Sequence, residues 1–149
     1  EDCERPAQFK ELAWGRCAWD ARRLPELERI RRGWVEAVFS DRDDEYDRVW
    51  RDKLAIMDVP NGDLIAIDIS RKDTAPVVYL SHDGGEGHGR VLGYSILDFI
   101  DRWTLVACVG PEDWLMTPFL HPDRPYLDPV GDTALTWRTW FGLEALKLV

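Results

Sequence analysis

The run VPNGDLIAIDIS, residues 59–70, constrains the fold of this chain more than any other segment. The pair Asn61-Gly62 favours a tight turn, and the isoleucine-rich run after it is typical of a strand. In strict alternation, one strand face holds Asp63, Ile65, Ile67 and Ile69, and the other holds Leu64, Ala66, Asp68 and Ser70. We expect the isoleucine face to pack on the core. The two aspartates are interpreted as strand-end residues, Asp63 in the turn and Asp68 bounding the strand.

A second strand signal follows at once. The run VVYLS, residues 77–81, is separated from the first strand by the polar turn RKDTAP. Two apolar runs joined by a short turn-rich link predict a β-hairpin, and therefore an antiparallel sheet. The next segment, HDGGEGHGR at 82–90, contains four glycines and is predicted to be a loop.

Helical patterns precede the hairpin. Residues 24–39 carry apolar side chains at three- and four-residue steps, with arginines opposite: Leu24, Leu27, Ile30, Trp34 and Val38. Residues 40–54 predict a second helix, whose early acids suit the helix dipole. Its inward face is formed by Tyr46, Val49, Trp50 and Leu54. A weaker pattern predicts an earlier helix over 7–14.

Helices also follow the hairpin. Residues 95–109 predict a helix with Ser95 as N-cap and Asp98 three residues later. A proline-rich loop over 110–131 surrounds the short run WLMTPFL, and a last helix over 132–143 begins at Asp132 and stops at Gly142. This order predicts an α+β fold, with a central antiparallel β-sheet flanked by N-terminal and C-terminal helices. We expect one domain over 1–149, with 1–20 as a candidate boundary tail.

The charge of the chain indicates its class of partner. The net charge is −9, and residues 35–149 hold the whole excess, with 21 acidic and 11 basic side chains. Such a surface repels phosphate backbones and anionic membranes and favours basic partners, although a merely soluble acidic protein is the alternative. We therefore expect neither nucleic acid nor a membrane as partner. Of the eight tryptophans, most are expected in the core and one or two as partner-facing anchors.

The cysteines and the first residues indicate the compartment. Cys3, Cys17 and Cys108 are too few and too scattered for a disulfide framework or a thiolate zinc site. The first residues are polar and form no signal-peptide pattern, and the absence of an initial Met suggests a trimmed chain. We expect a reducing, cytoplasmic location.

Four residues of the glycine-rich loop are the strongest candidates for catalysis or metal binding: His82, Asp83, Glu86 and His88. Their spacing matches no metal motif, and no Gly-Lys-Ser/Thr follows for a phosphate loop. A calcium loop over 41–52 is disfavoured, since Tyr46 and Asp52 stand where glycine and glutamate are needed. We expect no catalytic residue, metal or cofactor. A metal-dependent hydrolase using the His82–His88 loop is retained only as the third alternative.

A family resemblance covers about residues 45–104. NGDLIAIDIS followed by APVVYLSHDGGEGHGRVLGYSILDFIDRW resembles the SUKH superfamily of Smi/Knr-type domains, with weaker support from TWRTWFGL. The resemblance implies an α+β fold with a central antiparallel sheet and a non-enzymatic, protein-binding role. Many bacterial members are immunity proteins that neutralise a toxin delivered between competing cells, often a nuclease. Fungal members act in cell-wall and signalling regulation.

We therefore expect a protein-binding module of immunity type, which occludes a cognate toxin that has a basic surface. An intracellular regulatory or scaffolding protein of the same fold is the alternative. The first candidate partner-binding group imitates phosphates and consists of Asp43, Asp44, Glu45 and Asp47. The second lies on the glycine-rich loop, interpreted as a flexible recognition loop, and consists of His82, Asp83, Glu86 and His88.

Overall fold

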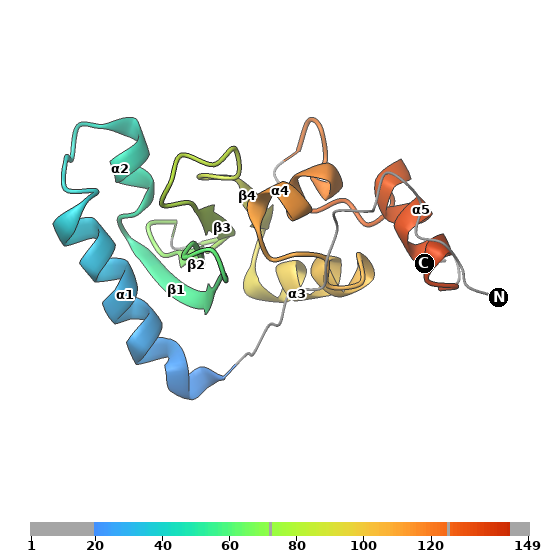
Figure 1. The fold of residues 1–149 in the computed structure, drawn as a ribbon, viewed down its shortest axis with the longest axis horizontal. Coiled ribbons are helices and arrows are strands. Elements are labelled where there is room, and N and C mark those ends of the chain that lie inside the picture. Colours follow the sequence, from blue (N-terminus) through green and yellow to red (C-terminus); the bar gives the residue numbers. More distant parts are fainter. Residues whose placement is uncertain (1–19, 72, 125, 144–149) are drawn as a thin grey trace.

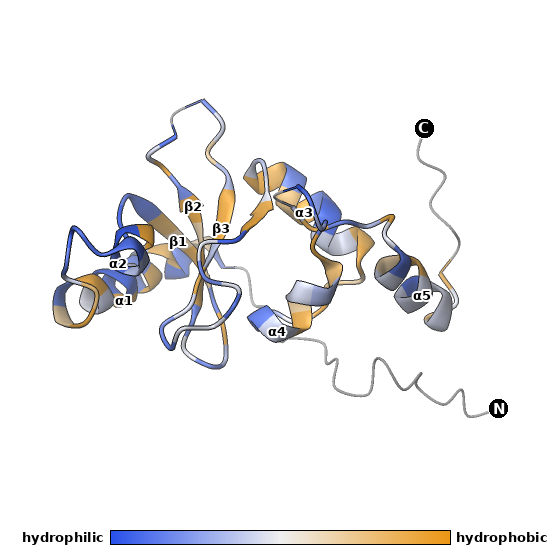
Figure 2. Cartoon of the chain, turned by 90° about the horizontal axis from the view of Figure 1, so that it is seen from above, coloured by the Kyte–Doolittle hydropathy of each residue, from blue (hydrophilic) through white to orange (hydrophobic). Residues whose placement is uncertain are grey.

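The computed structural model describes residues 20–71, 73–124 and 126–143. The helix predicted over 7–14, Cys3, Cys17 and nearly all of the proposed boundary tail lie outside these residues. The described chain has the predicted α+β architecture, in which a central antiparallel sheet carries helices on both faces (Figures 1 and 2).

The sheet is a meander of four strands in the order β1-β2-β3-β4. Its strands are β1 (Lys53–Asp58), β2 (Leu64–Asp68), β3 (Val77–Leu80) and β4 (Val91–Gly93). The predicted hairpin is confirmed as β2–β3, with Ile65 paired to Tyr79. The Asn61-Gly62 turn joins β1 to β2, and Gly62 adopts a φ of 101° there, which only glycine adopts readily. Neither β1 nor β4 was predicted.

Both faces of β2 are buried, which corrects the prediction of a single core face. Leu64 and Ala66 belong to a cluster with Leu27 of α1 (Leu24–Ala37), while Ile65 belongs to a second cluster with Phe99. The cause is visible in Figure 2, where α1 covers one face of the sheet and α3 (Ile96–Leu105) lies on the other. The predicted core residue Ile69 is 53% exposed, because it lies beyond the end of β2.

The helix predicted over 40–54 is wrong in extent. Within this range only α2 (Glu45–Val49) is helical. Earlier in the chain, a short 3-10 turn at Ala21–Arg23 leads directly into α1. Asp52 takes a φ of 52°, and the chain then enters β1, which places Leu54 on a strand. The arginines of α1 are also not all on the outer face, because Arg31 is buried and donates to the Trp50 carbonyl at 2.6 Å.

The second face of the sheet is covered by the C-terminal half of the chain. The Ser95 cap of α3 is confirmed, since its Oγ accepts from the Asp98 N–H at 3.1 Å. The helix ends at Leu105, four residues earlier than predicted, because Ala107 and Cys108 adopt left-handed backbone angles. The proline-rich region contains α4 (Asp113–Met116) and a 3-10 turn, Thr117–Phe119.

The last helix, α5 (Asp132–Trp140), packs against the end of α3 away from the sheet (Figure 1). Its N-cap is Gly131 and not Asp132, whereas the predicted stop at Gly142 is confirmed by its φ of 67°. Among the described helices, none has the length and apolar character needed to cross a bilayer.

Candidate partner-binding surface

The two acidic segments predicted from the sequence form one surface, and Tyr46 joins them. Its hydroxyl donates to the Ser81 carbonyl at 2.6 Å and accepts from the Gly84 N–H at 2.9 Å. Its ring stacks on His88, with centroids 3.6 Å apart and planes 12° apart. The segment 41–47 and the loop 82–90 are therefore held side by side, with the loop lying between α2 and α4 (Figure 1). We call these two segments the acidic surface.

The four acids of segment 41–47 have different roles. Asp44 caps α2 by accepting from the Tyr46 and Asp47 N–H groups, and the Asp47 carboxylate accepts from the Asp41 N–H at 2.9 Å. Asp43 and Glu45 are exposed, and the Glu45 side chain is 95% accessible, with only a long contact of 4.0 Å to Arg48. Asp43 and Glu45 are therefore the carboxylates of this segment that are most available to a partner.

His88 lies beneath the acidic surface and holds it together. Its Nδ1 accepts from the Ser81 N–H at 3.1 Å, so its proton is on Nε2, which faces the Tyr46 carbonyl at 3.0 Å. Burial disfavours the charged ring and lowers the pKa of His88. Both nitrogens of this residue are occupied by backbone groups. The His88 side chain therefore connects the glycine-rich loop to Ser81 and to α2 through these two backbone contacts.

His82 is anchored by the buried carboxylate of Asp63, a residue whose predicted role was only to help form a turn. Asp63 is 1% exposed, and its oxygens receive four hydrogen bonds. The donors are Asn61 Nδ2 at 2.7 Å, Tyr79 OH at 2.8 Å, His82 N at 2.8 Å and His82 Nδ1 at 2.6 Å. Asp63 therefore fixes the start of the glycine-rich loop to the β1–β2 turn. The Asn61-x-Asp63 pattern was visible in the sequence, but its partners were not.

The polar network continues from Asp63 to α4. The Tyr79 hydroxyl that donates to Asp63 also accepts from the Asp113 N–H at 3.1 Å, and burial together with nearby carboxylates raises the pKa of Tyr79. The buried Asp113 carboxylate accepts from the Gly87 N–H at 2.9 Å. A Cβ built on Gly87 would lie 2.3 Å from the Asp113 Cβ. Gly85 and Gly87 thus permit close packing of the loop against Asp113, and the loop that was predicted to be flexible is held there by a hydrogen bond to a buried carboxylate.

The same contacts bear on metal and acid–base chemistry. Asp63, His82 and Asp83 offer ligand atoms within 4.8 Å of one another. A cation would have to displace existing partners, since Asp63 accepts four hydrogen bonds and Asp83 accepts from Ser81 Oγ at 2.8 Å. His88 likewise has both ring nitrogens engaged by backbone groups, so it could join His82 and Glu86 around a metal only by giving up one of these contacts. What the arrangement does is fix the loop in place.

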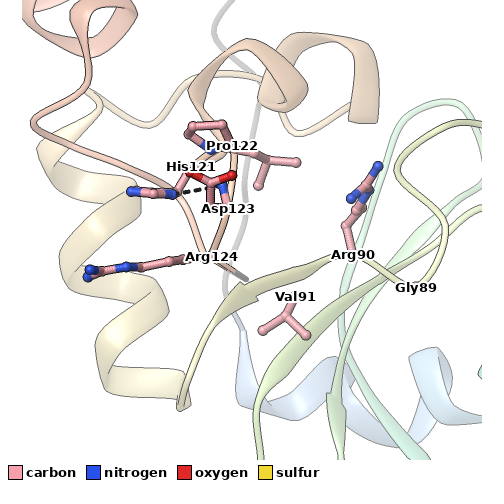
Figure 3. Close-up of a pocket in the computed structure, with 8 residues that line it drawn as sticks. Gly89, Arg90, Val91, His121, Pro122, Asp123 and Arg124 are labelled. Carbon is pink, nitrogen blue, oxygen red and sulfur yellow. Dashed lines mark hydrogen bonds between the residues drawn. The ribbon is translucent and has the colours of Figure 1, made fainter.

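A separate pocket of about 370 Å³ lies at the start of β4 (Figure 3). Its wall includes Arg90, His121 and Arg124, which is unusual on an acidic chain. In Figure 3 the Arg90 side chain extends away from those of His121 and Arg124. Arg124 Nη1 donates instead to the Tyr126 hydroxyl at 3.2 Å. The guanidinium groups of Arg90 and Arg124 therefore do not converge on one anion.

The lowered pKa of the part-buried His88 ring predicts that the free energy of unfolding depends on pH. Because its pKa is lowered by folding, the unfolded chain binds a proton first as the pH falls below about 6.5. We expect the His88 contribution to the free energy of unfolding to be complete above that pH and to decline below it.

Urea unfolding between about pH 7.5 and about pH 5.5 measures this change in the free energy of unfolding. His88→Phe should be less stable but should show a flatter pH profile. An unchanged slope in His88→Phe would contradict the assignment.

Comparison with known proteins found no matching family model, no similar curated protein and no similar solved structure. The resemblance of residues 45–104 to Smi/Knr-type domains therefore stays a prediction. The functional argument rests on the geometry of the acidic surface.

Proposed function

We propose that this chain is a non-enzymatic protein-binding domain of immunity type, which neutralises a cognate toxin by covering a basic surface on it. The observation that carries the proposal is the joining of segments 41–47 and 82–90 by Tyr46 and His88. The contact between Tyr46 and Gly84 joins residues that are 38 positions apart in the chain, and it makes the two acidic segments a single surface. The family resemblance of the central segment supports the same function.

Electrostatic steering is the mechanism by which this surface acts. Asp43, Glu45, Asp83 and Glu86 are exposed, and their carboxylates take the place of the phosphates that a nuclease-type toxin binds. On a chain of net charge −9 they attract a basic cleft over several ångströms and raise the association rate. Contact then covers the cleft and excludes its substrate.

Rigidity makes the surface effective. The loop is held from three sides, by Tyr46, by Asp63 and by Asp113. A surface ordered before binding loses little conformational entropy on association, which leaves more of the contact energy as affinity. We place this activity in the cytoplasm, where the free thiol of Cys108 is compatible with reducing conditions.

The direct test is to co-express this protein with the product of the adjacent reading frame and to measure whether it restores growth. Co-purification then tests whether the two proteins form a complex. We expect growth to be restored and a stable complex to be recovered. The absence of both rescue and complex formation with that product would overturn the immunity proposal.

Charge reversal on the acidic surface should slow association. Asp43→Lys combined with Glu45→Lys leaves in place the N-cap made by Asp44 and the hydrogen bond from the Asp41 N–H to Asp47. We expect the association rate constant at low salt to fall about tenfold or more, and its salt dependence to weaken. Stopped-flow measurements over a range of salt concentrations provide the test.

The matched control for charge reversal is Asp73→Lys with Asp101→Lys. These residues are exposed, one in the β2–β3 turn and one on α3, and bring the same change in net charge. We expect the control to slow association much less, because the β2–β3 turn lies at the end of β3 opposite the glycine-rich loop and Asp101 lies on α3. Equal slowing by both pairs would show that net charge alone matters and that the acidic surface is not the interface.

A further inference from the structure

Trp114 is the large aromatic side chain that the fold leaves most exposed among the described residues, at 57%. Its neighbours on α4, Leu115 and Met116, are buried in the core at 4% and 1% exposure. Trp114 therefore points away from the core that its own helix helps to build. Exposed tryptophans of this kind are enriched at the energetic centres of protein interfaces.

The position of Trp114 is fixed relative to the glycine-rich loop. The Asp113 carboxylate accepts from the Trp114 N–H through Oδ1 at 2.8 Å and from the Gly87 N–H through Oδ2 at 2.9 Å. One buried carboxylate thus ties the backbone of α4 to the backbone of the loop. Because both of its oxygens are engaged, Asp113 orders this region but offers little to a ligand.

A groove of about 350 Å³ runs between Trp114 and the loop. Its walls combine an apolar side with one exposed acid, and they are formed by Gly85, Glu86, Asp113, Trp114, Thr117 and Pro118. Among the described residues, Glu86 has no ion-pair partner within 4.0 Å, so its charge is available. The groove therefore presents an aromatic surface and a free carboxylate together.

We propose that this groove binds an arginine side chain of the partner, with the guanidinium on the Trp114 indole and paired with the Glu86 carboxylate. The proposal rests on the proposed function, because it takes the partner to be a basic protein. A planar guanidinium stacks on an indole and also donates to a carboxylate, which a compact ammonium group does less well. Trp114 is thus the apolar anchor beside the acidic surface, and the Glu86 carboxylate makes the groove prefer a positively charged side chain.

A short peptide tests the groove without the toxin. The full chain is labelled with 5-fluorotryptophan, and the Trp114 resonance is assigned from the spectrum of Trp114→Phe. Titration with acetyl-Gly-Arg-Gly-amide should shift that resonance saturably, with a dissociation constant on the order of millimolar. The uncharged citrulline peptide should not shift it, and Glu86→Gln should weaken the response at least about threefold. An unmoved Trp114 resonance, or equal shifts from both peptides, would overturn the proposal.

The cognate partner provides the second readout. Trp114→Ala should raise the dissociation constant of the complex about thirtyfold, as is usual for a tryptophan anchor. Leu97→Ala is the control, because Leu97 is 71% exposed on α3 and lies outside the groove lining. Circular dichroism confirms that each variant is folded. A Trp114→Ala variant that binds like the Leu97→Ala variant contradicts the anchor role.

The two proposals fail in distinguishable ways. If the adjacent gene product does not bind but the arginine peptide still shifts Trp114 through Glu86, the immunity function is overturned and the groove stands. If the toxin binds but neither the peptide nor Trp114→Ala has an effect, the groove is overturned and the immunity function stands.

Discussion

Asp63→Ala is expected to lower the free energy of unfolding by about 3–5 kcal/mol, the range for removing one partner from a buried charged network. The Asp63 carboxylate is 1% exposed and accepts four hydrogen bonds. Alanine leaves the buried Tyr79 hydroxyl and the part-buried N–H groups of His82 without the carboxylate that accepts from them. Each buried donor left unpaired costs about 1–3 kcal/mol, so the losses accumulate until the site relaxes.

Urea unfolding at neutral pH measures the effect of Asp63→Ala. Asp63→Asn keeps the shape and one acceptor oxygen, so we expect a smaller loss, of about half that size. Asp101→Ala provides the control on an exposed helix position, where the change should stay within about 0.5 kcal/mol. A loss below about 1 kcal/mol for Asp63→Ala would show that the network does not depend on this carboxylate.

Gly87→Ala is expected to lower the free energy of unfolding by about 1–3 kcal/mol, the usual effect of overpacking. The added methyl group would lie 2.3 Å from the Asp113 Cβ, which is fixed to the backbone of α4 and is not the far end of a flexible side chain. We expect the loop to move away from α4, which breaks the hydrogen bond from the Gly87 N–H to Asp113. The Trp114 groove should change with it.

Thermal and urea unfolding measure the stability change in Gly87→Ala, and the fluorotryptophan resonance of Trp114 reports the groove. Gly33→Ala is the matched control. Gly33 lies inside α1 with nothing within 4 Å of its added Cβ, so alanine should raise the free energy of unfolding by up to about 1 kcal/mol. If Gly87→Ala were as stable as Gly33→Ala, with Trp114 unchanged, the close packing of loop and α4 would not exist in solution.

The sequence predicted those elements whose signals are local. The spacing of Leu27 and its neighbours identified α1, the Ser95 hydroxyl identified the start of α3, and Gly142 identified the end of α5. In each case the information lies within one or two turns of the element itself. The β2–β3 hairpin was predictable for the same reason, since its turn joins strands that are adjacent in the chain.

The missed strands depend on distant partners. The acids and apolar spacing of 40–54 favour a helix locally, yet β1 pairs with β2 over five positions and takes Leu54 into the sheet. The short strand β4 follows four glycines and has no strong pattern of its own, so only its pairing with β3 defines it. A ladder of hydrogen bonds to another strand outweighs the weak helical preference of so short a segment.

By itself the sequence determined the fold class, the turn before β2 and the acidic character of the chain, because periodicity, turn chemistry and charge are carried by neighbouring residues. Tertiary structure alone decided which of these residues act together. It buried Asp63 as the acceptor for His82, placed His88 under Tyr46, and set Trp114 beside Glu86. These relations join residues that lie up to 42 positions apart at the His88–Tyr46 contact. Their energies depend on burial and on partners that no local pattern specifies.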